Sequence, residues 1–268
     1  MSKIVFASDF HLGQKGLLSS ADREKAIVKW IDEVAMEADE VFLLGDTFDF
    51  WYEYKSVIPK GFTRFLGALA ELADTGKPIH MFTGNHDMWI FKYFTEEFGI
   101  PIYRQPTLFE RQGKKLIIGH GDGLGPGDFT YKIIKKIFNN PICIHLFHWL
   151  HPSIGMSIAN AWSTGSRNSH NDIYKFLGPE KEYLLQHCES ESVIDPTIDY
   201  YIFGHRHLPI EFTLNNGKSK YINTGDWLAF QSYATMENGS INVQFFENPS
   251  SMVVTNDVNS WDKNKINF

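Results

Sequence analysis

Short apolar runs alternate with segments of helical periodicity over the first 125 residues. Continuous apolar runs of strand length predict four strands, at residues 4–7, 41–44, 79–82 and 116–118. Between them, apolar residues recur every three or four positions from Ala26 to Val34 and from Phe62 to Leu72, which predicts two helices. Ser19 and Asp22 have the spacing of a capping box for the first helix. This alternation indicates crossover units and a largely parallel sheet in an α/β fold.

The segment from about residue 126 to 190 has a different character. It is helical in pattern and rich in His, Asn, Ser and Trp, and it lies between two strand-like stretches. We interpret it as a helical lid inserted into the domain. Short strands return from Tyr200 to Phe246, with hairpin turns predicted at Asn215-Asn216-Gly217 and Asn238-Gly239. We therefore expect one domain over residues 1–247, followed by a loosely held polar tail at 248–268.

Composition and charge narrow the function classes. The 268 residues are 43% apolar and 21% charged, which is typical of a globular protein. The 25 basic and 32 acidic residues give a net charge of −7, which disfavours nucleic acid as a partner. Two cysteines, Cys143 and Cys188, are too few for a disulfide framework. The chain shows no secretory signal pattern and no run of 18 apolar residues, so we expect a cytoplasmic protein without a membrane span.

Five predicted strands each end in residues that commonly bind metals. These ends are Asp9-Phe10-His11, Asp46 with Asp49, Asn85-His86-Asp87, His120-Gly121-Asp122 and His205-Arg206-His207. Ligands of open α/β sheets bind beyond the carboxyl ends of the strands. We therefore expect seven side chains to meet at one edge: Asp9, His11, Asp46, Asn85, His120, His205 and His207. Nitrogen and oxygen ligands without a thiolate suit a pair of divalent ions such as Mn²⁺, Fe²⁺ or Zn²⁺. Ordinary surface or core roles are the alternative, which five such ends in order disfavour.

These motifs together resemble those of the calcineurin-like metallophosphoesterases, over about residues 1–247. The resemblance implies a four-layer αββα sandwich. It also implies a first metal ion bound by Asp9, His11, Asp46 and His207, and a second bound by Asp46 as bridge, Asn85, His120 and His205.

The resemblance further implies two catalytic residues. His86 would stabilise the phosphate or protonate the leaving group, and Asp49 would orient His86. A carboxylate behind an imidazole fixes its tautomer and favours its charged form. For Asp49 the alternative is a turn or a helix cap. Asp87 and Asp122 are either hydrogen-bond acceptors for ligand histidines or ordinary turn residues.

The insertion carries more apolar side chain than a small surface segment needs. In residues 132–138, Ile133, Ile134, Ile137 and Phe138 share one helical side and the lysines lie mostly on the other. Such a helix suits an anionic membrane surface, or it packs on the domain with its lysines in water. The residues that follow fit a core between lid helices, a dimer face or a chamber for acyl chains. In the last case we expect Ile133, Ile137, Leu146, Phe147, Trp149 and Ile154 to line it.

A further resemblance concerns the substrate. The order Gly45-Asp46-x-Phe48-x-x-Trp51, His120-Gly121-Asp122, helical insert, Gly204-His205-x-His207 and Gly225-Asp226-Trp227 is similar to that of the UDP-2,3-diacylglucosamine hydrolases. This resemblance implies Mn²⁺-dependent cleavage of UDP-2,3-diacylglucosamine to UMP and 2,3-diacylglucosamine 1-phosphate in lipid A synthesis. It also implies a location at the cytoplasmic face of the inner membrane. Asp128 matches a substrate-side lid aspartate, and Arg167 and Asn168 are the nearest equivalents of the residues that bind the phosphosugar.

One residue departs from the best-known branch of that family. In that branch an arginine follows the motif asparagine, where this chain has His86. A histidine can also donate a proton, which an alkoxide leaving group needs more than a sugar phosphate does. A general phosphodiesterase or phosphomonoesterase is therefore the alternative function. A scaffold without catalysis, like the retromer subunit of this fold, is disfavoured because all seven ligand positions are filled.

Overall fold

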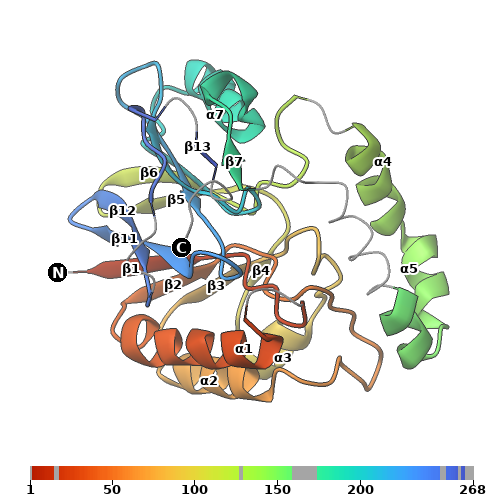
Figure 1. Cartoon of the computed structure of the whole chain (residues 1–268). Helices are drawn as coiled ribbons and strands as arrows, with labels where there is room; N and C mark the ends of the chain where they lie inside the picture. Colours follow the sequence, from red (N-terminus) through yellow and green to blue (C-terminus); the bar gives the residue numbers. More distant parts are fainter. Residues whose placement is uncertain are drawn as a thin grey trace.

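Two β-sheets form the centre of the computed structural model, which describes residues 2–14, 18–126, 129–158, 174–247, 252–258 and 261–262. The six-stranded sheet has the order β12-β11-β1-β2-β3-β4 and the five-stranded sheet the order β5-β6-β8-β10-β9 (Figure 1). The first contains β1 (Lys3–Ala7), β2 (Glu40–Leu43), β3 (Ile79–Phe82), β4 (Ile102–Tyr103), β11 (Ser232–Glu237) and β12 (Ser240–Phe245). The second contains β5 (Thr107–Arg111), β6 (Lys114–Ile118), β8 (Tyr200–Phe203), β9 (Pro209–Thr213) and β10 (Lys220–Thr224).

The central strands of both sheets are parallel, as the strand and helix alternation predicts. Strands β1 to β4 pair in parallel, and so do β6, β8 and β10. Antiparallel strands are added at the sides, β11 and β12 beside β1, and β5 and β9 at the two edges of the second sheet. The carboxyl ends of the parallel strands therefore lie at a shared edge, where the polar motifs begin.

Alternating side chains on the strands separate four layers. On β1, Ile4 and Phe6 pack in the core between the sheets, whereas Val5 and Ala7 pack in the core beneath the helices. The first sheet's outer face is covered by α1 (Ser20–Trp30), α2 (Thr63–Asp74) and α3 (Tyr93–Phe98). The Ser19 side chain caps α1 by accepting a hydrogen bond from the Asp22 backbone N–H, and a π-helical turn (Ile31–Ala35) continues this helix. The expected αββα sandwich is thus confirmed.

The outer layer on the second sheet is α7 (Tyr183–Ile194), which begins within the range expected for the insertion. Its Leu184, Leu185 and Cys188 are buried against Tyr201 and Phe203 of β8. Ahead of it lie β7 (Lys175–Phe176) and a short 3₁₀ turn (Pro179–Lys181). The part of the insertion that stands beside the sandwich is therefore shorter than 126–190.

Helices α4 (Phe129–Phe138) and α5 (Pro141–His148) form the part of the insertion that stands beside the sandwich, followed by helical residues 152–158 (Figure 1). Aromatic contacts attach α4 and α5, because Phe138 and Phe147 pack on Trp89. The Trp89 indole also donates to the Phe138 carbonyl at 2.9 Å. Seven large apolar side chains here are exposed: Ile133, Ile137, Ile142, Leu146, Trp149, Ile154 and Ile158.

The expected division of α4 into an apolar side and a basic side is only partly correct. Lys132 donates to the Gly125 carbonyl at 2.8 Å, and Lys135 forms an ion pair with Asp122. Both lysines therefore contact the sandwich, while Ile133 and Ile137 are 60% and 50% exposed. Among the described residues, none of the helices is long and apolar enough to cross a membrane.

Part of the C-terminal segment is held more firmly than we expected. Val254 is fully buried and exchanges backbone hydrogen bonds with the second sheet at Pro209 and Glu211. Strand β13 (Trp261–Asp262) pairs with β7. The expectation of a loose tail is therefore wrong for residues 252–258, because one apolar side chain and an edge strand fix them.

Candidate metal centre

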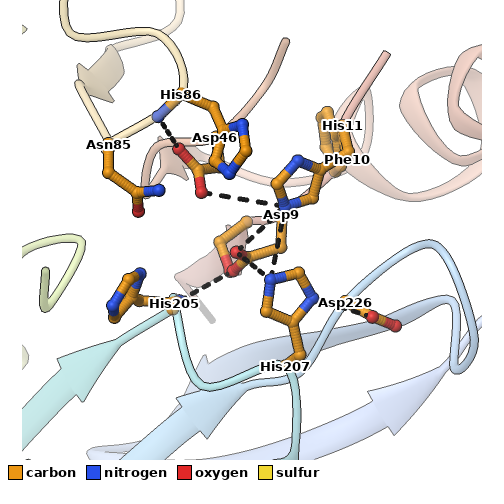
Figure 2. A network of polar contacts seen from close by, with 12 residues as sticks. Asp9, Phe10, His11, Asp46, Asn85, His86, His205, His207 and Asp226 are labelled. Atoms are coloured by element: carbon orange, nitrogen blue, oxygen red, sulfur yellow. Dashed lines mark hydrogen bonds and ion pairs between the residues drawn. The ribbon is translucent and has the colours of Figure 1, made fainter. Parts of the chain in front are cut away.

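The strand ends bring the predicted residues into one buried cluster. Figure 2 shows Asp9, His11, Asp46 and His207 gathered together, with Asn85 and His205 beside them. Six residues of the predicted set, together with His86, form three overlapping groups whose ligand atoms lie within 4.8 Å of one another: Asp9, His11 and His207; His11, Asp46 and His86; Asp46, His120 and His205.

Backbone conformation marks the same residues independently. Ten non-glycine residues of the described chain have a positive φ, and five of them are Asp9, His11, Asp46, His205 and His207. This conformation is unfavourable for residues with a side chain and persists where the surroundings enforce it. The fold therefore holds these five side chains in place at a conformational cost.

The first half of the cluster lies between the ends of β1 and β8. The His207 Nε2 atom is 3.4 Å from Asp9 Oδ1, and His11 Nε2 is 3.7 Å from the same oxygen. The two imidazole Nε2 atoms are 3.3 Å apart. The other Asp9 oxygen is fixed by the backbone N–H of His205 at 2.9 Å. One carboxylate oxygen and two ring nitrogens thus converge on a single point.

The second half lies beyond the ends of β2, β3 and β6. The Asp46 Oδ2 atom is 3.3 Å from His120 Nε2 and 3.7 Å from His11 Nε2, so Asp46 stands between the two halves. Its Oδ1 atom accepts a hydrogen bond from the His86 backbone N–H at 2.8 Å. The Asn85 Oδ1 atom is 3.2 Å from His120 Nε2. This half offers carboxylate, amide and imidazole groups.

Unsatisfied polar atoms show that the cluster fits metal ions. Asp9 Oδ1 and Asp46 Oδ2, which face the imidazole nitrogens, are buried without a hydrogen-bond partner. Buried polar atoms are otherwise almost always satisfied, and a carboxylate oxygen facing imidazole nitrogens is the donor set of a divalent ion. A Cβ at Gly84 or Gly204 would clash with the carboxylate of Asp46 or Asp9. The glycines before the motif residues therefore leave room for these carboxylates.

Hydrogen bonds behind two histidines fix which ring nitrogen faces the centre. His120 donates from Nδ1 to the Leu44 carbonyl at 2.8 Å, and His207 donates from Nδ1 to Asp226 Oδ2 at 2.9 Å. Each ring thereby presents Nε2 to the cluster, as a ligand imidazole requires. Asp226 was not among our predicted site residues, although it follows β10 after Gly225 just as Asp46 follows β2 after Gly45.

The pKa values of the clustered side chains show that their carboxylates favour positive charge nearby. Burial disfavours protonation of His11 and His120, yet the neighbouring carboxylates outweigh it and raise the pKa of each imidazole to about 10. Burial likewise opposes ionisation of Asp9, but His207, His11 and His120 lower its pKa to about 2. Burial and the nearby His120 lower the pKa of His205 to about 4. The carboxylates thus favour positive charge at this centre, as a site for divalent ions requires.

His86 borders the cluster and contacts Asp49 in two ways. Its Nδ1 atom donates to the Asp49 carbonyl at 3.1 Å and lies 3.4 Å from the Asp49 carboxylate, which also approaches His11 Nδ1 at 3.8 Å. We expected the carboxylate to favour a charged His86. Instead, burial and the adjacent His11 lower the pKa of His86, although Asp46 and Asp49 oppose them.

Two of the remaining predicted residues, Asp87 and Asp122, have structural roles. Asp87 accepts hydrogen bonds from four backbone N–H groups, of Asp46, Thr47, Phe48 and Gly84, and so joins the ends of β2 and β3. Asp122 pairs with Lys135 of α4. Asp128, Arg167 and Asn168 lie outside the described residues.

A two-sheet sandwich with clustered Asp, Asn and His side chains at its parallel strand ends is typical of a metal-dependent hydrolase. The Calcineurin-like phosphoesterase family model matches residues 2–209. The chain therefore belongs to the calcineurin-like phosphoesterase family, and it is a metal-dependent hydrolase.

Two curated relatives and one solved structure give the range of similarity. A UDP-2,3-diacylglucosamine hydrolase of Porphyromonas gingivalis is 34% identical, over 92% of this chain and 98% of that protein. One from Pseudomonas fluorescens is 27% identical, over 84% of this chain and 87% of that protein. The Escherichia coli phosphoesterase Yfce has a TM-score of 0.47 and 17% identity, with 93% of this chain and 96% of that chain covered.

Proposed function

We propose that this enzyme hydrolyses UDP-2,3-diacylglucosamine to UMP and 2,3-diacylglucosamine 1-phosphate. The observation that carries this proposal is the position of an exposed apolar insertion beside a buried Asp and His cluster. The curated relatives of that name, at 27–34% identity over most of the chain, support it. We also propose that residues 1–247 act as one domain, with the insertion as its substrate-selecting part.

We propose that two divalent ions, preferably Mn²⁺, occupy the cluster. Asp9, His11 and His207 would hold the first, Asn85, His120 and His205 the second, and Asp46 both. Bound there, the ions would neutralise phosphate charge and activate water. The protein's contribution is to keep the donor atoms close in an environment that excludes bulk water, which strengthens each electrostatic interaction.

We assign His86 to the substrate side of the cluster. A neutral ring whose Nδ1 donates to the Asp49 carbonyl keeps its lone pair on Nε2. In this form His86 would accept a hydrogen bond at Nε2 from a substrate hydroxyl, rather than supply a full charge to the phosphate. Asp49 would act as its positioning residue, chiefly through the main-chain contact. Asp128, Arg167 and Asn168 remain our proposed contacts to the phosphosugar.

The insertion would select the lipid. Ile133, Ile137, Leu146, Trp149 and Ile154 are at least half exposed, so acyl chains could cover them. Each methylene buried there contributes roughly 0.8 kcal/mol before ordering costs. Phe147, which we expected in the same chamber, instead packs on Tyr52 and Trp89 and anchors the insertion. Contact with an anionic inner-membrane surface would then use this apolar face more than Lys132 and Lys135.

A comparison of two substrates tests this proposal. Release of UMP from UDP-2,3-diacylglucosamine is measured beside hydrolysis of an aryl phosphate diester, for Trp149→Glu and a control, Val193→Glu. Both residues are exposed, at 77% and 83%, but Val193 lies on α7. We expect Trp149→Glu to lower kcat/KM for the lipid at least tenfold while sparing the diester, and Val193→Glu to change neither.

A general phosphodiesterase or phosphomonoesterase is the second candidate. His86 favours it, because a histidine whose Nε2 carries a proton can protonate an alkoxide leaving group, which an arginine cannot do. This alternative predicts fast turnover of the aryl diester and no UMP release from the diacyl substrate. It also predicts that Trp149→Glu and Val193→Glu behave alike.

A further inference from the structure

The loop that carries His205 and His207 needs outside support. Both residues have positive φ values, 65° and 58°, so the loop between them is conformationally unfavourable. The Asn223 side chain holds the Gly204 carbonyl, and Asp9 holds the His205 N–H. These contacts fix where the loop begins. The residue between the two histidines, Arg206, points elsewhere.

Arg206 ties this loop to residues 175–182, which lie ahead of α7. Its guanidinium donates from Nε and Nη2 to the two carboxylate oxygens of Glu182, each at 2.7 Å, and also to the Lys175 carbonyl. The pair is buried, with Arg206 11% and Glu182 3% exposed. A two-point Arg–carboxylate contact fixes orientation as well as distance. Arg206 therefore locks the peptide between His205 and His207 against residues 175–182.

A second tie comes from the same segment and reaches His207. The Tyr174 hydroxyl donates to Asp226 Oδ2 at 2.9 Å, and His207 Nδ1 donates to the same oxygen at 2.9 Å. Asp226 Oδ1 accepts from the backbone N–H groups of Ala229 and Phe230. The carboxylate that orients His207 (Figure 2) is therefore itself held from both sides, with Tyr174 as one of its anchors.

We propose that Tyr174 and Glu182 are positioning residues for the metal centre, which couple residues 174–182 to His205 and His207. This inference rests on the proposed assignment of those two histidines as ligands. Glu182 acts through Arg206 on both, and Tyr174 acts through Asp226 on His207 alone. Residues far along the chain from the motif thereby set how well the motif binds metal.

A second Arg–carboxylate pair with the same two-point geometry provides the control for the role of Glu182. Glu40 accepts from Arg111 Nε and Nη2 at 2.7 Å each, the same geometry, on β2 at the strand end remote from the cluster. Mn²⁺ is titrated calorimetrically into chelator-treated protein carrying Glu182→Gln or Glu40→Gln, with melting temperatures measured in parallel. We expect both variants to melt lower, but only Glu182→Gln to weaken Mn²⁺ binding, by tenfold or more.

Tyr174→Phe provides the second test. Its control is Tyr233→Phe, because the Tyr233 hydroxyl also donates a hydrogen bond to a side chain, that of Gln244 on β12, at 2.9 Å. We expect Tyr174→Phe to weaken one of two Mn²⁺ binding events at least threefold and Tyr233→Phe to weaken neither. Wild-type Mn²⁺ affinity in both Glu182→Gln and Tyr174→Phe, or equal weakening in their controls, would overturn the proposal. If the wild-type protein bound no Mn²⁺, the ligand assignment itself would fail. If Glu182→Gln does not fold, Tyr174→Phe decides alone.

Discussion

Replacement of Asp46 by asparagine removes the one carboxylate that contacts both halves of the cluster. The side chain is 1% exposed, and its Oδ2 atom lies 3.3 Å from His120 Nε2 and 3.7 Å from His11 Nε2. Asparagine keeps the shape and can still accept the hydrogen bond from the His86 N–H. The substitution therefore removes the charge while leaving the packing in place.

The size of the effect follows from that geometry. A unit charge about 4 Å from a carboxylate interacts with it by about 4 kcal/mol at the effective dielectric constant of a protein. Loss of that attraction corresponds to roughly a 10³-fold fall in rate. We therefore expect kcat at saturating Mn²⁺ to fall by about three orders of magnitude, with an unchanged circular dichroism spectrum.

Glu24→Gln is the control for this experiment. Glu24 is also a buried carboxylate, but it caps α2 by accepting from the backbone N–H groups of Arg64 and Phe65. It should lower stability and leave kcat within about twofold. More than a tenth of wild-type kcat in Asp46→Asn would refute the bridging role.

Three further predictions concern metal choice, pH and the insertion. EDTA should abolish hydrolysis, and Mn²⁺ should restore it better than Mg²⁺, because Mg²⁺ disfavours imidazole ligands. Full recovery with Mg²⁺ alone would contradict the assignment of histidines as metal ligands. Burial opposes ionisation of Glu40, but His80 and Arg111 lower its pKa from 4.5 to about 2. The ionised Glu40 therefore stabilises the folded protein above about pH 4.5, and this contribution is lost as the pH falls toward 2. Urea unfolding should show Glu40→Gln less stable by about 2 kcal/mol at pH 7, with a difference that shrinks at pH 3; a constant difference would refute this. Lys135→Met removes the ion pair with Asp122. Backbone hydrogen exchange in α4 should then accelerate severalfold, while exchange in α2 stays unchanged. Unchanged exchange in α4 would show that the ion pair does not hold this helix.

The parts of the fold that could be predicted are those with a strong local pattern. Buried strands such as β2 are continuous apolar runs, and the cap at Ser19 is a local signal. Strand β5 was not predicted, because its residues alternate between exposed and half-buried and include Glu110 and Arg111. The burial of Val254 depends on a contact with Ile210, far away in the chain, which no local pattern contains.

The candidate site could be predicted where its residues directly follow strands. All seven expected residues lie in or beside the cluster because parallel strands end at the same edge. The contacts behind them were harder to predict: Asp226 lies in a motif that we noted, yet its contact with His207 depends on how β10 and β8 pair. Tyr174 and Glu182 carry no sequence signal, since they lie late in the expected insertion and reach the site only through the fold.

The central claim is that these strand ends form a dinuclear metal centre bridged by Asp46. The most direct measurement is an anomalous difference map, recorded near the manganese absorption edge, from crystals grown with Mn²⁺. We predict two peaks, one beside Asp9, His11 and His207 and one beside Asn85, His120 and His205, with Asp46 contacting both. A single peak, or peaks only at other histidines such as His145 and His148 of α5, would contradict the account.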